Sequence, residues 1–296
     1  MSGQPSLYLH IGLPKTATTT LQLHGFRNHP DLDYAGTHLP RILNRDPLFN
    51  LLSAYVMRGE GQVMDIRKRL IERVESSSRP LMISEENFII GAFDGYPASH
   101  PFSQTRADKL SRLYDLVQGM DFLVLVSLRP FSASVFSAFV EYQEQWQRSS
   151  RSILDTVKTG DAMGMYRTAE LRKELDALWP DKVVPIAFED IVAGEVSIPG
   201  FSWQADKPVP NTRQHTKTER GVLREIVSGR PFLRLARSIG GASPSLARRL
   251  WSIRTSRTVE VKFWGEDLRD SLATLEQASD AARRSWLESA TPTEQQ

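Results

Sequence analysis

The chain has 296 residues, of which 40% are hydrophobic and 24% are charged, so it can bury a substantial core and lacks the composition of a disordered protein. The 37 Lys and Arg residues against 35 Asp and Glu residues give a net charge of +2, which points to no charged partner. The absence of cysteine excludes disulfides, thiolate metal ligands and a thiol nucleophile. The segment Met1–Ser6 has no basic n-region, and no apolar stretch approaches the roughly 18–20 residues of a membrane span. We therefore expect a soluble, cytoplasmic protein without a signal peptide or a transmembrane segment.

The first predicted elements form a strand–turn–helix unit. Ser6–Ile11 is short, apolar and rich in β-formers, and it ends at Gly12, which predicts a buried strand. Thr18–Arg27 predicts a helix, with Thr16 or Thr18 as its N-cap. The turn between the two elements therefore lies at the start of a helix.

Three later apolar runs also predict buried strands: Pro80–Ser84, Phe122–Ser127 and Val183–Phe188. Pro185 makes the last of them an edge strand or a distorted one. The predicted helices around them are Arg41–Met57, Gln62–Ser76, Thr105–Gln118, Ser132–Trp146 and Leu171–Leu178. Strands separated by helices predict an α/β fold, in which helices cover both faces of a central parallel sheet.

The sequence changes in character after Pro199. Gly200–Thr212 predicts a loop, and everything after Thr216 predicts helix or turn, with a frayed tail over Ala290–Gln296. We expect a single domain, made of a core over residues 1–217 and a helical C-terminal extension over residues 218–296 that packs on that core.

The turn Gly12–Thr20, called the anion loop below, carries groups that bind anions. The first N–H groups of a helix lack intrahelical partners and lie at the positive end of its dipole. Lys15 adds a full positive charge, the threonines add hydroxyl donors, and Gly12 permits a tight turn. The nucleotide-triphosphate loop G-x-x-x-x-G-K-[ST] does not match, because the second Gly is missing and Lys15 comes too early. The predicted binding residues of this loop are Gly12, Pro14, Lys15, Thr16, Ala17, Thr18, Thr19 and Thr20.

A second predicted anion-binding element follows the strongest strand. Arg129 and Pro130 come directly after this strand, and the next helix carries Ser137 two helical turns later. A guanidinium offers a planar fork of donors that suits a phosphate, and this spacing lets the Ser reach the same anion.

The segment LHIGLPKTATTTLQ resembles the 5′-phosphosulfate loop of sulfotransferases, and FLVLVSLRPFSASVFSAF resembles their 3′-phosphate segment. The resemblance implies a P-loop-like three-layer sandwich that moves the sulfuryl group of 3′-phosphoadenosine 5′-phosphosulfate to an acceptor hydroxyl or amine without a metal. It implies that Lys15 contacts the phosphosulfate bridge, that the threonines hold the 5′-phosphate, and that Arg129 and Ser137 bind the 3′-phosphate. Ala17 stands where many members have Gly.

Two softer matches extend this resemblance from residue 7 to residue 217. Phe188–Ile191 fits a strand-end sequence of the family with a structural role, and PVPNTRQHTKTE resembles a segment of bacterial carbohydrate-type members. This second segment implies that Arg213 and Lys217 contact the 3′-phosphate or the adenosine; the alternative is solvated loop residues. By the same resemblance we expect a carbohydrate or glycolipid acceptor.

The acceptor needs a base, which the resemblance implies is a His or a Glu. His38 lies in a polar stretch after the first helix, whereas Glu85 and Glu86 directly follow the second strand, at the edge where parallel sheets form their sites. A His with a pKa of about 6.5 needs no tuning, and a Glu needs its pKa raised by burial or by a neighbouring carboxylate. His38, Glu85 and Glu86 stay open as alternatives.

The stretch Arg224–Arg257 is rich in Arg, and Glu225 is its only acid. The favoured interpretation is solvated Arg residues on helices that pack through their apolar sides. The alternative is a basic surface for an anionic acceptor, or for peripheral contact with a membrane. No recognition motif accompanies the charge, so we expect no nucleic acid partner.

Two other function classes compete with the sulfotransferase. A Mg-dependent kinase or phosphotransferase would also use a strand–loop–helix with Lys15, but Arg129 stands where a metal-binding acid would be expected. A catalytically inactive nucleotide-binding module is the other, and the intact Lys15, Arg129 and Ser137 argue against it.

Overall fold

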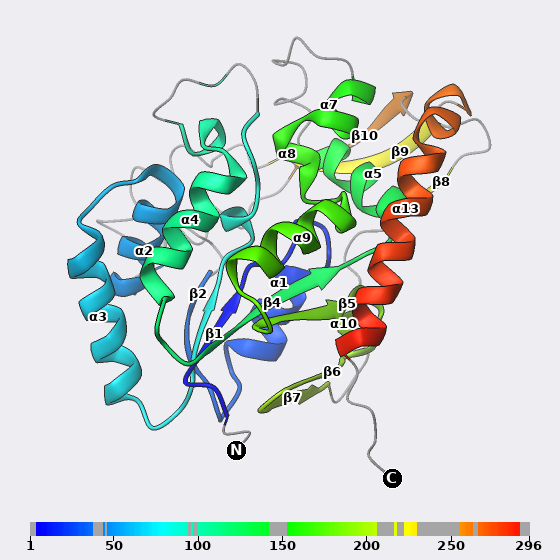
Figure 1. Ribbon diagram of the computed structural model, residues 1–296. Coiled ribbons are helices and arrows are strands. Elements are labelled where there is room, and N and C mark those ends of the chain that lie inside the picture. The colour runs from blue at the N-terminus through cyan, green and yellow to red at the C-terminus, as the bar shows by residue number, and fades with distance from the viewer. Residues whose placement is uncertain are drawn as a thin grey trace. The chain divides into compact units, whose positions relative to one another are not determined.

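The computed structural model describes residues 4–37, 44, 46–93, 96, 100–141, 153–205, 216–217, 222–229, 255–262 and 266–290. Its centre is a five-stranded parallel sheet in the order β2-β3-β1-β4-β5 (Figure 1). The strands are β1 Leu7–His10, β2 Asp33–Gly36, β3 Leu81–Ser84, β4 Phe122–Leu128 and β5 Val183–Ala187. The predicted parallel α/β sheet is confirmed, and so is the edge position of the strand that contains Pro185.

One strand of this sheet, β2, was not predicted from the sequence. β2 forms the other edge, and its sequence DYAG has no apolar run because only its second half is buried. Arg73 of the helix Val63–Ser76 donates to both carboxylate oxygens of Asp33, at 2.5 and 2.7 Å. Local periodicity does not reveal so short and polar an edge strand.

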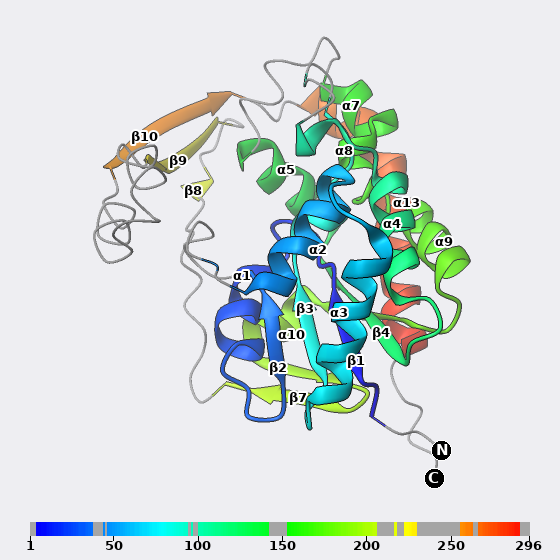
Figure 2. The ribbon, with the colours of Figure 1, turned by 90° about the vertical axis from the view of Figure 1, so that its left-hand side faces the viewer.

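Helices cover both faces of the sheet: in Figure 2, α1 and the hairpin strand β7 lie on one side, with α3, α4 and α9 on the other. The helices before the last parallel strand are α1 Thr18–Thr20, η1 Leu21–Phe26, α2 Pro47–Arg58, α3 Val63–Ser76, η3 Glu86–Phe88, η4 Pro101–Ser103, α4 Arg106–Val117, α5 Phe131–Glu141, α7 Ile153–Thr159, α8 Asp161–Gly164 and α9 Thr168–Leu178. The short helix α10 Phe188–Ala193 and the long helix α13 Glu266–Ala290 follow it.

The predicted start of one helix is wrong by several residues, and the predicted end of another falls beyond the described residues. α2 begins at Pro47, not at Arg41, because the Asp46 side chain accepts from the Phe49 N–H at 2.9 Å as an N-cap and Pro47 takes the first helical position. The predicted end of the α5 helix at Trp146 lies outside the described residues.

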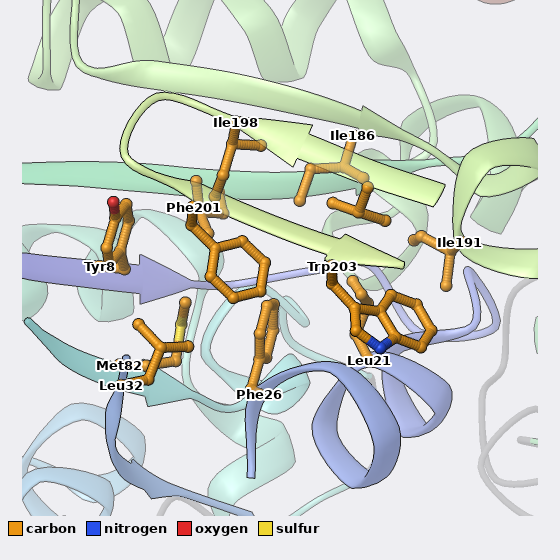
Figure 3. Packing of buried hydrophobic residues seen from close by; sticks show 12 residues of the cluster. Tyr8, Leu21, Phe26, Leu32, Met82, Ile186, Ile191, Ile198, Phe201 and Trp203 are labelled. Atoms are coloured by element: carbon orange, nitrogen blue, oxygen red, sulfur yellow. The ribbon is translucent and has the colours of Figure 1, made fainter. Parts of the chain in front are cut away.

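A hairpin packs on one face of the sheet. β6 Glu195–Ile198 and β7 Phe201–Gln204 pair antiparallel around Gly200, whose φ of 75° needs a glycine. Phe201 and Trp203 are buried against Tyr8 and Phe26 in one hydrophobic cluster (Figure 3). The predicted loop is therefore wrong for Phe201–Gln204, where inward apolar and outward polar residues alternate as in a half-buried strand.

A second compact unit comprises Thr37–Arg45 and Pro210–Ser271. Its described part includes a three-stranded antiparallel sheet of β8 Thr216–Lys217, β9 Val222–Gly229 and β10 Thr255–Lys262. The prediction of helix or turn after Thr216 is wrong for these strands, and Arg224 and Arg257 lie on strands. β9 and β10 pair across a long connection, which local patterns do not reveal, although TVEVK has β-propensity.

The predicted C-terminal helix is confirmed as α13. The division of the chain at residue 217 stays a prediction. Within the part of the chain that the structure describes, no helix combines the length and the apolar character that a bilayer crossing requires.

Helix α13 supplies the N-terminal cap of α5. The Phe131 N–H donates to Asp280 Oδ1 at 2.8 Å, and the Ser132 hydroxyl donates to the Glu276 carboxylate. The first N–H groups of α5 have no partners within that helix, and the Asp280 carboxylate, from a distant part of the sequence, satisfies the one of Phe131. This contact fixes the start of α5 directly after Arg129.

We expect Asp280→Ala to lower the free energy of unfolding by about 1 kcal/mol, the usual cost of a lost N-cap. Urea unfolding followed by circular dichroism measures the change. Asp270→Ala, which alters an exposed carboxylate of the same helix, should change it by no more than about 0.5 kcal/mol. Equal losses in the two variants would contradict the capping role.

Candidate functional site

The candidate site lies where β1 and β4 end side by side. The chain that leaves β1 goes to β2 and β3 on one side of the sheet, whereas the chain that leaves β4 goes to β5 on the other. A crevice at the carboxyl ends of two such strands is where open parallel sheets bind ligands. The anion loop follows β1 and Arg129 follows β4, so the topology brings the two predicted elements together.

Gly12 starts the anion loop at a position with no room for a side chain. A Cβ there would lie 2.4 Å from Ser127 Oγ, 2.5 Å from His10 Nε2 and 2.7 Å from Thr18 Cγ2. The glycine is therefore required by the close approach of three side chains, one from each of the elements β1, β4 and α1.

The anion loop uses left-handed backbone at two residues that are not glycine. Lys15 has a φ of 66° and Ala17 a φ of 61°. For a residue with a Cβ, this conformation costs roughly 1–2 kcal/mol. The sequence departure noted above, an Ala where the resembling family often has Gly, thus falls on a position whose conformation favours Gly.

Replacing Ala17 by Gly is expected to keep the fold and to change the free energy of unfolding by no more than about 1 kcal/mol. The relief of left-handed strain and the larger backbone entropy of Gly in the unfolded chain oppose each other. A thermal unfolding scan beside Ala17→Val measures this, since a β-branched residue should be clearly destabilising at this φ. Equal stability of the two variants would argue against the left-handed backbone.

The Thr16 side chain faces inward and holds the loop. It is fully buried, its hydroxyl donates to the Leu13 carbonyl at 2.5 Å, and its oxygen lies 2.7 Å from Ser127 Oγ. Among the described residues, nothing accepts from the backbone N–H groups of Ala17, Thr18 and Thr19. The loop therefore presents backbone donors, with Thr16 as an internal support.

Arg129 connects the anion loop to α5. Its Nη1 donates to the Lys15 carbonyl at 3.0 Å and to Ser137 Oγ at 3.1 Å, and its guanidinium lies 4.5 Å from the centre of the Phe188 ring. Burial lowers the pKa of Arg129 below its usual value. Among the described residues no carboxylate forms an ion pair with Arg129, although the charge of Glu189 acts on it and opposes the lowering of its pKa.

Two contacts around the anion loop and Arg129, made by Tyr166 and Phe188, were not predicted from the sequence. The buried Tyr166 donates its hydroxyl proton to the Pro14 carbonyl at 2.9 Å, and it comes from a short turn after α8. Phe188 supplies the ring under Arg129. A Tyr outside any motif carries no local signal, because only the tertiary fold brings it to the loop.

The two adjacent glutamates after β3 have different contacts. Glu85 is buried, and its carboxylate accepts from the Asn87 N–H at 3.0 Å, which caps the short turn η3. Glu86 Oε2 instead accepts from the Thr18 hydroxyl at 2.5 Å. Glu86 is thus hydrogen-bonded to the anion loop.

His10 is fully buried at the end of the central strand. Its Nδ1 lies 2.7 Å from Ser84 Oγ, and its ring packs edge-on against Phe26 at 5.1 Å. Burial lowers the pKa of His10 to about 3, so its imidazole is neutral in the folded chain at pH 7.

Acid is therefore expected to unfold the chain partly through His10. Between its folded pKa of about 3 and the ordinary His pKa of about 6.5, the unfolded chain binds a proton that the folded chain does not, so stability falls as the pH is lowered. Urea midpoints at pH 4 and pH 7 measure this. His10→Phe should reduce the difference, whereas His24→Gln, at an exposed position, should retain it.

Two of the predicted site residues, His38 and Arg213, lie outside the described residues. Lys217 lies on β8, paired with Leu223. The predicted acceptor-facing loop Gly91–Ser103 is fixed at its start, where the Ala92 N–H donates to Asp161 Oδ2 at 2.6 Å.

No family model matches the chain, and no curated protein matches it. Among solved structures, the sulfotransferase from Alicyclobacillus acidocaldarius is similar, with 13% sequence identity and a TM-score of 0.43 over 97% of this chain and 96% of that one.

Proposed function

We propose that this chain is a sulfotransferase that uses 3′-phosphoadenosine 5′-phosphosulfate as donor and a hydroxyl or amine, on a carbohydrate or glycolipid, as acceptor. The observation that carries the proposal is the meeting of the two anion-binding elements at Arg129, whose guanidinium bonds to both Lys15 and Ser137. The sequence resemblance of these same two segments supports the identity of the donor, and that of the softer segment supports the acceptor class.

The residues fit a nucleotide with anionic groups at both ends. A half-buried guanidinium without a described carboxylate partner suits a phosphate, because an uncompensated buried charge is costly. In this proposal Arg129 and Ser137 hold the 3′-phosphate, while Lys15 and the N–H groups of Ala17, Thr18 and Thr19 hold the 5′ end. Arg213 is proposed as a further contact. When bound, the donor supplies an activated sulfuryl group.

In this proposal the chain contributes to the reaction by positioning the donor and the acceptor and by stabilising negative charge. Transfer between two oxygens held in line needs alignment and stabilisation of the negative charge that develops. In this proposal the Lys15 ammonium stabilises that charge from a position in the left-handed turn of the anion loop. No metal is required in this scheme.

Glu86 is the carboxylate that the hydrogen bonds favour as the base. It accepts a hydrogen bond from the Thr18 hydroxyl in this structure, so its oxygen lies within hydrogen-bond reach of the anion loop. Glu85 is committed to capping η3, which favours a positioning role for it. His38 stays the alternative base.

Isothermal titration calorimetry with 3′-phosphoadenosine 5′-phosphate tests the donor site. We expect binding that does not depend on Mg²⁺ and that weakens in Lys15→Ala and Arg129→Ala. Mg-ATP is titrated in parallel, and transfer of labelled sulfuryl groups to a panel of carbohydrates follows. Binding of Mg-ATP alone would overturn the proposal and favour a kinase, whereas binding without transfer to any acceptor would favour an inactive nucleotide-binding module.

A further inference from the structure

His10 carries a buried polar atom that the proposed mechanism does not use. Its Nε2 is buried and has no hydrogen-bond partner among the described residues, and His10 ends the strand that leads into the anion loop. An unpaired buried polar group is costly, so a fold that retains one at a site has a use for it.

The hydrogen bonds on the other side of the ring assign its tautomer. The Gln22 amide donates to Ser84 Oγ at 3.1 Å, and Ser84 Oγ lies 2.7 Å from His10 Nδ1. If Ser84 donates to Nδ1, the proton of the neutral ring is on Nε2 and every group except that N–H is satisfied. The opposite tautomer would leave two groups unpaired among the described residues, the Ser84 proton and the Nε2 lone pair. The first arrangement is therefore favoured.

The Nε2 atom lies beside the hydroxyl that supports the anion loop. Nε2 and Ser127 Oγ both lie within 2.5 Å of the point where a Gly12 Cβ would be. Thr16 uses its only hydroxyl proton on the Leu13 carbonyl, so Ser127 must be the donor in the 2.7 Å contact with Thr16. The lone pairs of Ser127 Oγ then stay available as acceptors.

The assigned donors and acceptors would form one continuous chain of hydrogen bonds if one further bond were made. Gln22 donates to Ser84, Ser84 to His10, Ser127 to Thr16, and Thr16 to Leu13, while the bond from His10 to Ser127 is not made. Gly12 is what lets the two atoms approach.

We propose that His10 is a positioning residue of the anion loop, whose Nε2–H donates to Ser127 Oγ when an anion occupies the loop and so fixes Thr16 around it. This inference rests on the proposed function for the identity of the anion. The bond needs the neutral ring, which the burial of His10 favours, and the Nε2–H tautomer, which the Ser84 hydrogen bonds favour.

The test is a ¹H–¹⁵N correlation spectrum of the His10 imidazole in the full chain at pH 7, with His10→Phe used to assign its signals. We expect the Nε2–H tautomer without ligand, and a marked shift of the Nε2–H signal when 3′-phosphoadenosine 5′-phosphate is added. An Nδ1–H tautomer or a charged ring in the ligand-free chain would overturn the inference, whatever the ligand does.

Two serine variants that alter the core less than His10→Phe does test the positioning role of His10 without unfolding the chain. Their binding is measured by calorimetry. Ser127→Ala and Ser84→Ala should each weaken binding of the bisphosphate by about twofold to tenfold, the effect of one neutral hydrogen bond, whereas Ser279→Ala, at a buried serine of α13, should not. If the bisphosphate binds and the Nε2–H signal does not move, this inference alone falls. If the bisphosphate does not bind at all, the proposed function falls and the inference falls with it.

Discussion

Replacing Lys15 by Ala is expected to lower kcat for sulfuryl transfer by roughly 10²–10³-fold, the usual effect of removing one group that stabilises developing charge. The ammonium acts on charge that grows as the reaction proceeds, so the loss falls more on kcat than on the affinity for the donor. The loop should keep its shape, because Thr16 and Tyr166 hold it through the Leu13 and Pro14 carbonyls. Steady-state kinetics with labelled donor measures the change.

Lys173→Ala is the matched control for this variant, since it removes an exposed ammonium from α9. It should leave kcat within about twofold of the original, as surface substitutions away from a site do. A Lys15→Ala chain that retains its turnover would contradict the assignment of the anion loop as the reacting end of the donor site.

Replacing Glu86 by Gln is expected to lower kcat by roughly 10²–10⁴-fold, the contribution of a positioned general base. Gln keeps the size of the side chain and its ability to accept from Thr18, so the geometry of the loop is preserved while the base is lost. The measurement is the pH profile of kcat, whose acidic limb should disappear together with the activity.

Glu85→Gln and His38→Gln complete this comparison. Glu85 is buried and caps η3, so its variant should lose stability with a smaller loss of kcat. A large loss of kcat in His38→Gln with turnover retained in Glu86→Gln would reassign the base to His38.

The sequence predicts the fold well where burial is complete. β1, β3 and β4 are runs of apolar residues in the middle of the sheet, and such runs identify buried strands without any tertiary information. The edge strand β2 and the pair β9–β10 were not predicted, because the first is polar and the second depends on pairing across a long connection. Stabilisation from distant residues has no local sequence pattern.

In the candidate site, too, residues with a local sequence pattern were predicted and residues that depend on tertiary contacts were not. Gly12, Lys15, Arg129 and Ser137 were predicted from motif spacing, because each stands at a fixed distance from the end of a strand. The choice between Glu85 and Glu86 could not be made from the sequence, since both follow the same strand and only side-chain direction separates them. Tyr166 reaches the anion loop through tertiary packing alone.

The central claim is that Arg129 and the anion loop bind the two ends of one nucleotide. The most direct measurement is a cycle of binding constants, in which 3′-phosphoadenosine 5′-phosphate and 5′-AMP are each titrated into the original chain and into Arg129→Ala. Charge-assisted hydrogen bonds of about 1.5–3 kcal/mol predict that the original chain prefers the bisphosphate by roughly 10–100-fold and that the variant loses this preference. The same preference in both proteins would contradict the claim, because the 3′-phosphate would then bind away from Arg129.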